Sequence, residues 1–206
     1  MTSEHPTATS GRKPKGGGPE RREEILAHAL RLFSVYGVHA VTTRQISATV
    51  GISQSSLYAY FPTKQSLVAE VSRRAFSALS ARMTQVLERS PGPGVLGRLA
   101  RVYIDFGLTQ PDAYRIAFMI EGSHKKTGAN ADTALGAGVN VFTIYRDAIA
   151  RRLGVGLAED AIDVLAQSLW AALHGLVSLI IARPRFPWAD RERLIEQHVR
   201  RLFGDD

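Results

Sequence analysis

The chain has 206 residues, of which 45% are hydrophobic and 22% charged, a length that fits one large domain or two small ones. It contains no cysteine, which excludes a disulfide framework, a thiolate nucleophile and any zinc site with sulfur ligands. The 26 Lys and Arg residues exceed the 19 Asp and Glu residues, and a net charge of +7 favours an anionic partner such as nucleic acid, an acidic protein or a membrane surface.

Residues 1–19 are rich in Thr, Ser, Gly and Pro and are predicted to form a disordered basic tail. Its three cations, Arg12, Lys13 and Lys15, either reach a DNA backbone or minor groove or only keep the tail soluble. The first residues have no apolar core, so we expect no signal peptide there. With no run of about 18 apolar residues, we expect a cytoplasmic protein without a membrane span.

A first helix is predicted over residues 20–37, where Gly37 serves as a left-handed cap. The prediction rests on apolar residues spaced three and four apart, namely Ile25, Ala29, Leu32, Phe33 and Tyr36.

Two short helices follow. Thr42 and Gln45 form a capping box that begins the first of them, and Gly51 ends it. Ser53 is the predicted N-cap of the second, which ends before Pro62. Two short helices joined around one glycine are typical of a helix-turn-helix, although many helical hairpins share this pattern.

The rest of the chain also has helical patterns. Thr63 is the predicted cap of a long helix that reaches about Arg89, before the Pro-Gly repeat at 91–94. Further helices are expected over 95–109, from Pro111, and near 133–153, 158–182 and 190–203, with a polar loop over 122–131. No stretch supports a strand, so the fold class is all-α, with about nine helices.

The exposed face of the third helix carries small polar and aromatic side chains that suit contacts with base edges and phosphates. They are Gln54, Ser55, Ser56, Tyr58 and Tyr60. Ile46, Val50, Ile52, Leu57 and Phe61 supply the apolar anchors that the two helices need.

The order of residues from Thr42 to Leu67 resembles the DNA-binding domain of the TetR family of bacterial transcriptional regulators. The matching elements are the Thr-x-x-x-Ile start, the Gly-Ile-Ser turn, the Leu-Tyr-x-Tyr-Phe block, and Lys64 and Leu67 behind them. Ser47 departs from the alanine that the family often has. The resemblance covers about residues 20–67 and implies a helix-turn-helix domain there. It implies an all-helical ligand-binding and dimerisation domain over 68–206.

The resemblance also implies roles for single residues. Thr43 and Arg44 are expected to contact phosphates or a groove, because a helix N-terminus favours phosphate. Lys64 is expected to clamp a backbone phosphate, and Gln54 and Ser55 to read bases. The recognition helix adds Ser56, Tyr58 and Tyr60. The implied partner is a palindromic double-stranded DNA operator, bound by a homodimer whose interface is formed by the last two helices.

The carboxyl-terminal part resembles one class of TetR domain through the signature Trp170, His174 and Gly175. Trp170 and His174 share a helix face, which forms either plain core or a wall of an effector pocket. Gly175 is expected to let a neighbouring helix approach closely. Large residues on the central helices are the pocket candidates, with ordinary core packing as the alternative: Tyr103, Phe106, Phe118, Met119, Phe142, Tyr145, Trp170 and His174.

These features predict a ligand-responsive dimeric repressor that a small molecule releases from its operator. An activator or ligand-independent regulator of the same fold is the alternative, followed by a nonspecific architectural DNA binder. An enzyme is not expected, because the chain has no Gly-x-Gly-x-x-Gly, Walker, Gly-x-Ser-x-Gly or His-Glu-x-x-His motif. Its six histidines are scattered, so we expect neither a metal site nor a cofactor.

Overall fold

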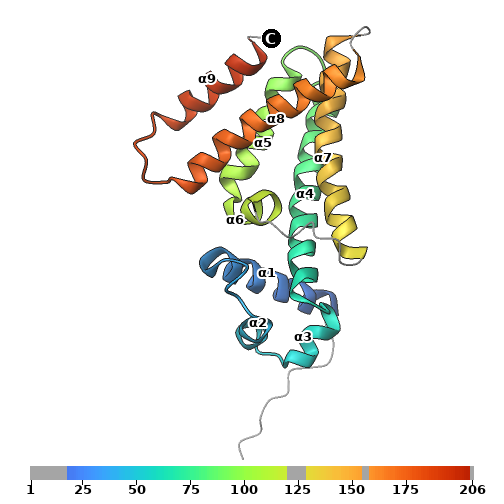
Figure 1. The fold of residues 1–206 in the computed structure, drawn as a ribbon, viewed down its shortest axis with the longest axis vertical. Coiled ribbons are helices and arrows are strands. Elements are labelled where there is room, and N and C mark those ends of the chain that lie inside the picture. Colours follow the sequence, from blue (N-terminus) through green and yellow to red (C-terminus); the bar gives the residue numbers. More distant parts are fainter. Residues whose placement is uncertain (1–17, 120–128, 155–157, 205–206) are drawn as a thin grey trace, which may run out of the picture.

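The computed structural model describes residues 18–119, 129–154 and 158–204, and omits the side chains of residues 129–135. Within these ranges the chain forms nine α-helices and one π-helical turn and contains no strand, as the all-α prediction requires (Figure 1). Most of the predicted tail, including its three cations, lies outside the described residues. Gly18 and Pro19 belong to the first helix.

The amino-terminal helices are α1 (Gly18–Tyr36), α2 (Thr43–Val50) and α3 (Gln54–Tyr60). The Thr42 side chain accepts a hydrogen bond from the Gln45 backbone, and the Gln45 side chain accepts one from the Thr42 N–H, which confirms the capping box. Gly51 ends α2 with a φ of 74°, a left-handed conformation that glycine adopts at little steric cost.

Thr63 is the N-cap of the helix α4 (Lys64–Arg89), as predicted, and it forms a capping box with Ser66. It is followed by α5 (Val95–Thr109), α6 (Pro111–Tyr114) and the π-helical turn η1 (Arg115–Met119). The last three helices are α7 (Ala129–Leu153), α8 (Glu159–Ala182) and α9 (Arg191–Phe203).

The helix α7 begins at Ala129, inside the segment predicted as a loop. The prediction of its start near residue 133 was therefore wrong, because a polar composition does not distinguish a loop from the first turn of a helix. The rest of the predicted loop, with His124, Lys125 and Lys126, lies outside the described residues.

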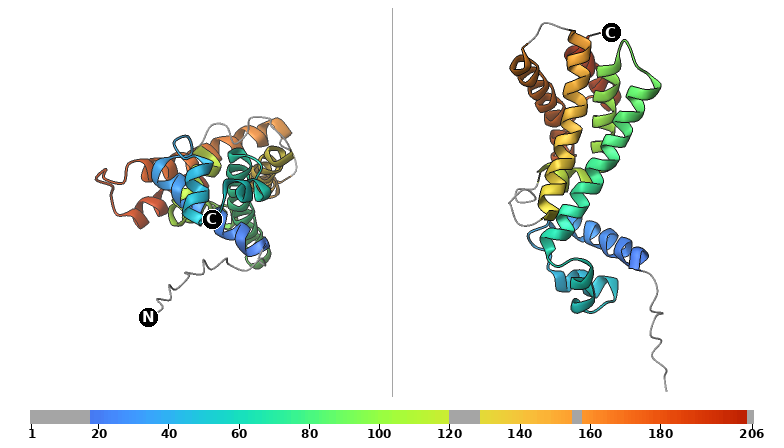
Figure 2. Two further views of the ribbon diagram at one scale, coloured as in Figure 1. Left: turned by 90° about the horizontal axis from the view of Figure 1, so that it is seen from below. Right: turned by 90° about the vertical axis from the view of Figure 1, so that its right-hand side faces the viewer.

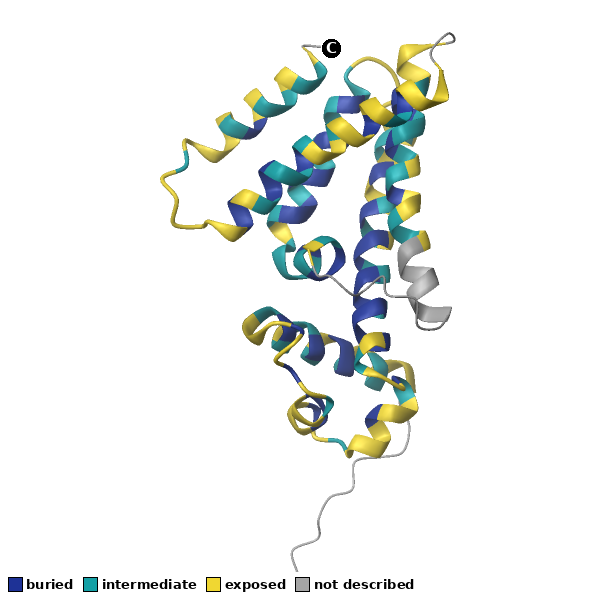
Figure 3. Cartoon of the chain, viewed as in Figure 1, coloured by how far each residue is buried: buried dark blue, intermediate teal, exposed yellow. Residues whose placement is uncertain are grey.

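The helices form two packed groups along the long axis of the molecule (Figures 1 and 2). α1, α2 and α3 gather at one end, and α4 runs from this group into the other, where α7 lies alongside it. Buried side chains form a small cluster in the first group, around Ile25, Ile46 and Leu57, and a larger one among α4 to α9 (Figure 3). The predicted boundary at residue 67 falls inside the continuous helix α4.

The close approach between α5 and α8 occurs at Gly107. A Cβ atom on Gly107 would overlap with Val177 Cγ1 and lie 3.1 Å from the Tyr114 ring. A Cβ atom on Gly175 would meet nothing within 4 Å. The expectation that Gly175 permits a close helix approach was therefore wrong, since this role belongs to Gly107.

By length and composition alone, the helix α8 is long and apolar enough to cross a membrane. The sequence prediction considered only unbroken apolar runs and did not identify it. Its most apolar window has a mean hydropathy of 1.8, and 33% of that window is buried inside the protein. One such helix among the described residues is weak evidence, because core and interface helices have the same composition. Four of its large apolar side chains are exposed, namely Val164, Leu165, Trp170 and Leu179.

Candidate DNA-binding surface and ligand cavity

The helix-turn-helix is held by both its core and its turn. Ile46 and Leu57 are fully buried and Val50 is nearly so, and they pack α2 against α3. After α2, the Gly51 N–H donates to Ala48 O over 3.2 Å and the Ile52 N–H donates to Ser47 O over 3.0 Å. These contacts fix where the exposed face of α3 lies relative to α2.

Three of the predicted DNA contacts lie together in the structure. Gln54 Nε2 donates to Thr43 Oγ1 over 3.2 Å, and Thr43 Oγ1 lies 3.1 Å from Tyr58 Oη. Thr43 stands at the start of α2, whereas Gln54 and Tyr58 project from α3. All three side chains are at least partly exposed, so α2 and α3 together present one polar surface to the solvent.

The predicted serine contacts cluster at the beginning of α3. Ser53 Oγ accepts from the Ser56 N–H over 3.1 Å and lies 2.9 Å from Ser55 Oγ. Ser55 and Ser56 are exposed, whereas Tyr60 is half-buried against the small core. Arg44 is exposed at the start of α2. The roles of these residues in binding DNA stay predictions.

Lys64 makes contacts that the sequence did not reveal. Its ammonium donates to Val38 O over 3.0 Å, to Val41 O over 2.9 Å and, more weakly, to His39 O over 3.5 Å. The ammonium therefore ties the start of α4 to the segment between α1 and α2. The phosphate contact stays a prediction, and the observed bonds give Lys64 a second, positioning role.

An ion-pair network also joins α1 to α4. The Glu70 carboxylate accepts from Arg22 over 2.9 Å, from Arg73 over 2.8 and 2.9 Å, and from Arg74 over 2.9 Å. Arg74 also pairs with Glu23 on α1. Hydrogen bonds from these guanidinium groups, that of Arg73 above all, hold the pKa of Glu70 well below its ordinary value. The sequence shows the spacing of Glu70 and Arg74 but not the partners on α1.

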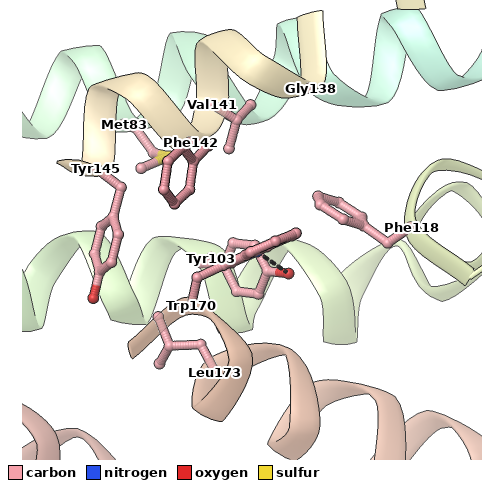
Figure 4. A pocket seen from close by; sticks show the side chains of 9 residues that line it. All are labelled: Met83, Tyr103, Phe118, Gly138, Val141, Phe142, Tyr145, Trp170 and Leu173. Atoms are coloured by element: carbon pink, nitrogen blue, oxygen red, sulfur yellow. Dashed lines mark hydrogen bonds between the residues drawn. The ribbon is translucent and has the colours of Figure 1, made fainter. Parts of the chain in front are cut away.

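A cavity of about 50 Å³ lies between α4, α5, η1, α7 and α8 (Figure 4). Five of the predicted pocket residues line it, namely Tyr103, Phe118, Phe142, Tyr145 and Trp170. Four further lining residues were not predicted, because their types are those of ordinary core: Met83, Gly138, Val141 and Leu173.

The three other candidates do not line the cavity. Phe106 is fully buried, with the Arg82 guanidinium 5.8 Å from its ring centre. Met119 is 41% exposed. His174 is not among the lining residues and instead contacts Tyr114.

A chain of hydrogen-bonded polar groups connects the cavity wall to His174. Trp170 Nε1 donates to Tyr103 Oη over 3.2 Å, as Figure 4 shows, and Tyr103 Oη lies 2.9 Å from Tyr114 Oη. Tyr114 Oη lies 2.6 Å from His174 Nδ1. Burial lowers the pKa of His174 and raises the pKa of Tyr103 to about 12, so these groups are neutral near pH 7. A neutral His174 that carries its proton on Nε2 accepts a hydrogen bond at Nδ1 from the Tyr114 hydroxyl.

Comparison with known families identifies both halves of the chain. Residues 25–71 match the family model for bacterial regulatory proteins of the tetR family, and residues 96–202 match the tetracyclin repressor-like C-terminal domain. The second match alone covers more than half of the chain.

Curated relatives include a nucleoid occlusion factor SlmA from Enterobacter sp., which is 34% identical over 167 residues, or 78% of this chain and 83% of the relative. The transcriptional repressor KstR2 from Mycolicibacterium smegmatis is 37% identical over 73 residues, or 35% of this chain and 36% of that protein. The matches to KstR2 and to SlmA from Haemophilus ducreyi span only 36% and 59% of those relatives.

Solved structures share the fold. The regulatory protein SCO4313 superposes with a TM-score of 0.75 at 22% identity, covering 91% of this chain and 97% of that one. The TetR-family regulator PfmR from Thermus thermophilus gives a TM-score of 0.68 at 18% identity, covering 88% and 98%. The helix-turn-helix geometry and the two family matches agree: the chain belongs to the TetR family of bacterial regulatory proteins.

Proposed function

We propose that this regulator is a dimeric cytoplasmic repressor that leaves a palindromic operator when a small molecule occupies the cavity. The observation that carries this proposal is the position of η1. Phe118 lines the cavity, whereas Ile116, two residues earlier, is 1% exposed and packs in the small core with Ile46 and Leu57. One short segment thus contacts both the cavity and the core of the DNA-binding helices.

The packing around Phe118 supports a mechanical link. Its ring centre lies 4.8 Å from that of Phe76 on α4 and 4.7 Å from that of Tyr114 on α6. A ligand that displaces Phe118 therefore moves a segment packed on α4 and α6, and α6 in turn contacts α1. The ligand shifts the equilibrium only if it binds the released state more tightly than the DNA-bound state.

Two features support a dimer: palindromic DNA has two half-sites, and α8 exposes apolar side chains. A two-fold dimer reads two half-sites about 34–36 Å apart, which one helix-turn-helix cannot do. Val164, Leu165 and Leu179 are 69%, 37% and 54% exposed, and they supply apolar area for a partner subunit. Leu176 and Ile180, on the same helix, are buried in their own domain.

The proposal is tested by measuring DNA binding and release in one assay. The protein is bound to a fluorescent duplex from its own upstream region, and a compound library is screened for loss of anisotropy. We expect a releasing compound for the wild type, and Phe118→Ala should bind DNA while the same compound releases it poorly. Specific binding that no compound reverses would favour a ligand-independent regulator, and equal binding to random DNA would favour an architectural protein.

A further inference from the structure

The Thr43 hydroxyl lies between two side chains of α3. It accepts a hydrogen bond from Gln54 Nε2 over 3.2 Å, and its oxygen lies 3.1 Å from Tyr58 Oη. Thr43 is half-buried at the start of α2, whereas Gln54 and Tyr58 are exposed. A β-branched threonine has few side-chain rotamers, whereas a glutamine turns about several bonds. The stiffer side chain therefore restrains the more flexible one.

The bond to Thr43 leaves the Gln54 amide with a definite pair of free groups. A glutamine amide has two N–H donors and one carbonyl acceptor. Thr43 engages one N–H, and the Gln54 side chain forms no other hydrogen bond within the described part of the chain. The second N–H and Oε1 remain as a neighbouring donor and acceptor. A glutamine needs this pair to bind N7 and N6 of adenine in the major groove.

The opposite orientation of the amide suits a different base. With Oε1 facing the Thr43 hydroxyl, only the NH₂ group would point outward, and its two donors fit the O6 and N7 acceptors of guanine. The direction of the hydrogen bond between Gln54 and Thr43 therefore decides which purine Gln54 prefers. A hydroxyl has a single proton, so Thr43 can only accept from Gln54 once it has given that proton to another group.

The Tyr58 hydroxyl is placed to receive that proton, because its oxygen lies within hydrogen-bond distance of Thr43 Oγ1. Tyrosine hydroxyls also donate to DNA phosphates, and a phosphate oxygen accepts hydrogen bonds but donates none. When Tyr58 donates to a phosphate, its oxygen is left to accept from Thr43. The hydrogen bonds then run in one direction, from Gln54 through Thr43 and Tyr58 to the DNA backbone.

We propose that Thr43 is a positioning residue for base reading, which holds the Gln54 amide in the orientation that selects adenine over guanine. A phosphate bound by Tyr58 fixes the direction of this hydrogen bond, so the backbone contact and the base contact are coupled. The inference rests on the proposed function, because it requires that α3 recognise specific DNA. The two claims fail with different results in the experiment that follows.

The base that Gln54 reads is found by binding-site selection. The full-length protein is incubated with duplexes that carry a randomised central segment, and the bound DNA is amplified and sequenced. The wild type should enrich a two-fold symmetric motif, and Gln54→Ala should lose one adenine from each half-site of this motif. A second duplex is then made in which guanine replaces this adenine in one half-site.

Fluorescence anisotropy on the two duplexes gives the preference for adenine. The wild type should prefer adenine by about fivefold to 150-fold, the range of one bidentate contact. Thr43→Val keeps the shape of the side chain without the hydroxyl, and its preference should be smaller by about threefold or more, the effect of one neutral hydrogen bond. Thr43→Ser keeps the hydroxyl and should match the wild type. Thr49→Val is the control and should keep the preference, because the Thr49 hydroxyl donates to Gln45 O over 2.8 Å rather than to α3.

Tyr58→Phe tests the coupling to the backbone. It should bind random DNA more weakly, because a phosphate contact is lost, and its preference for adenine should fall as well. Folding has its own readout. The Thr43 variants keep the capping box of Thr42 with Gln45, so their melting temperatures should lie within about 2 °C of the wild type.

Three results would overturn the inference while leaving specific binding intact. They are an unchanged preference in Thr43→Val or Tyr58→Phe, a loss in Thr43→Ser as large as in Thr43→Val, and a base other than adenine at the position that Gln54→Ala loses. A wild type that enriches no motif would refute specific recognition itself, and the inference with it.

Discussion

Replacing Lys64 by methionine keeps much of the aliphatic stem and removes the ammonium that both of its roles require. The two roles are separated by the measurements, because stability reports the positioning role and the salt dependence of DNA binding reports the phosphate contact. Two of its bonds, to Val38 O and Val41 O, are 3.0 and 2.9 Å long, and the third, to His39 O, is 3.5 Å and weak. Hydrogen bonds from charged groups contribute about 1.5–3 kcal/mol each, and half-exposed carbonyls regain part of this from water. We expect a loss of about 1–3 kcal/mol in the free energy of unfolding.

The measurement is urea unfolding of the full chain by circular dichroism, combined with DNA binding at several salt concentrations. Lys64→Met should bind all DNA sequences more weakly, because the segment before Thr43 loses its anchor. The slope of log affinity against log salt should also fall by about 1 if Lys64 contacts a phosphate, and it should stay near the wild-type value if Lys64 only positions this segment.

Arg44→Met is the matched control, since Arg44 is exposed at the start of α2. Its stability should stay within about 0.5 kcal/mol of the wild type, and its salt slope should fall by about 1 if Arg44 contacts a phosphate. Unchanged stability of Lys64→Met together with a salt slope lowered by about 1 would refute the positioning role and support the phosphate clamp.

Four further results are expected. Gly107→Ala should lower the free energy of unfolding by about 1–3 kcal/mol in urea, because the added methyl group overlaps with α8. Gly175→Ala should raise it by up to about 1 kcal/mol, because alanine favours the helix and nothing lies near its methyl group. Equal effects of the two substitutions would contradict the close approach at Gly107. Gln54→Ala should cost roughly 1–3 kcal/mol in affinity on the cognate site only, and equal losses on random DNA would exclude base reading. The depressed pKa of Glu70 stabilises the fold above the ordinary glutamate pKa of 4.5, and this contribution is lost as the pH falls below it. Glu70→Gln should therefore be less stable than the wild type at pH 7 and should lose less stability on acidification. Parallel curves of the free energy of unfolding against pH for the variant and the wild type would argue against the ion-pair network. Val164→Glu should give monomers in light scattering, and an intact dimer would place the interface elsewhere.

The elements that the sequence predicted correctly depend on local chemistry. Thr42 with Gln45, and Thr63 with Ser66, satisfy free N–H groups within one turn, so neighbouring residues suffice to place both helix starts. Gly51 ends α2 because its backbone conformation suits glycine, which is again a local requirement.

The features that the sequence did not reveal depend on contacts between distant segments. Tyr114 joins Tyr103 and His174 across 11 and 60 residues, and Lys64 reaches carbonyls more than 20 residues before it. Apolar periodicity marks Val141 as core, yet only the packing of several helices makes it part of a cavity wall. The π-helical turn η1 is missed for the same reason, since its pattern of apolar residues fits an ordinary helix.

The central claim is specific, two-fold recognition of DNA by the exposed face of α3. Its most direct test is fluorescence anisotropy of the purified protein on its own upstream DNA against a scrambled duplex, at about 150 mM salt. Binding tighter than about 10⁻⁸ M to the upstream DNA alone, at two subunits per site, is the predicted result. Equally weak binding to both duplexes by ligand-free protein would contradict it.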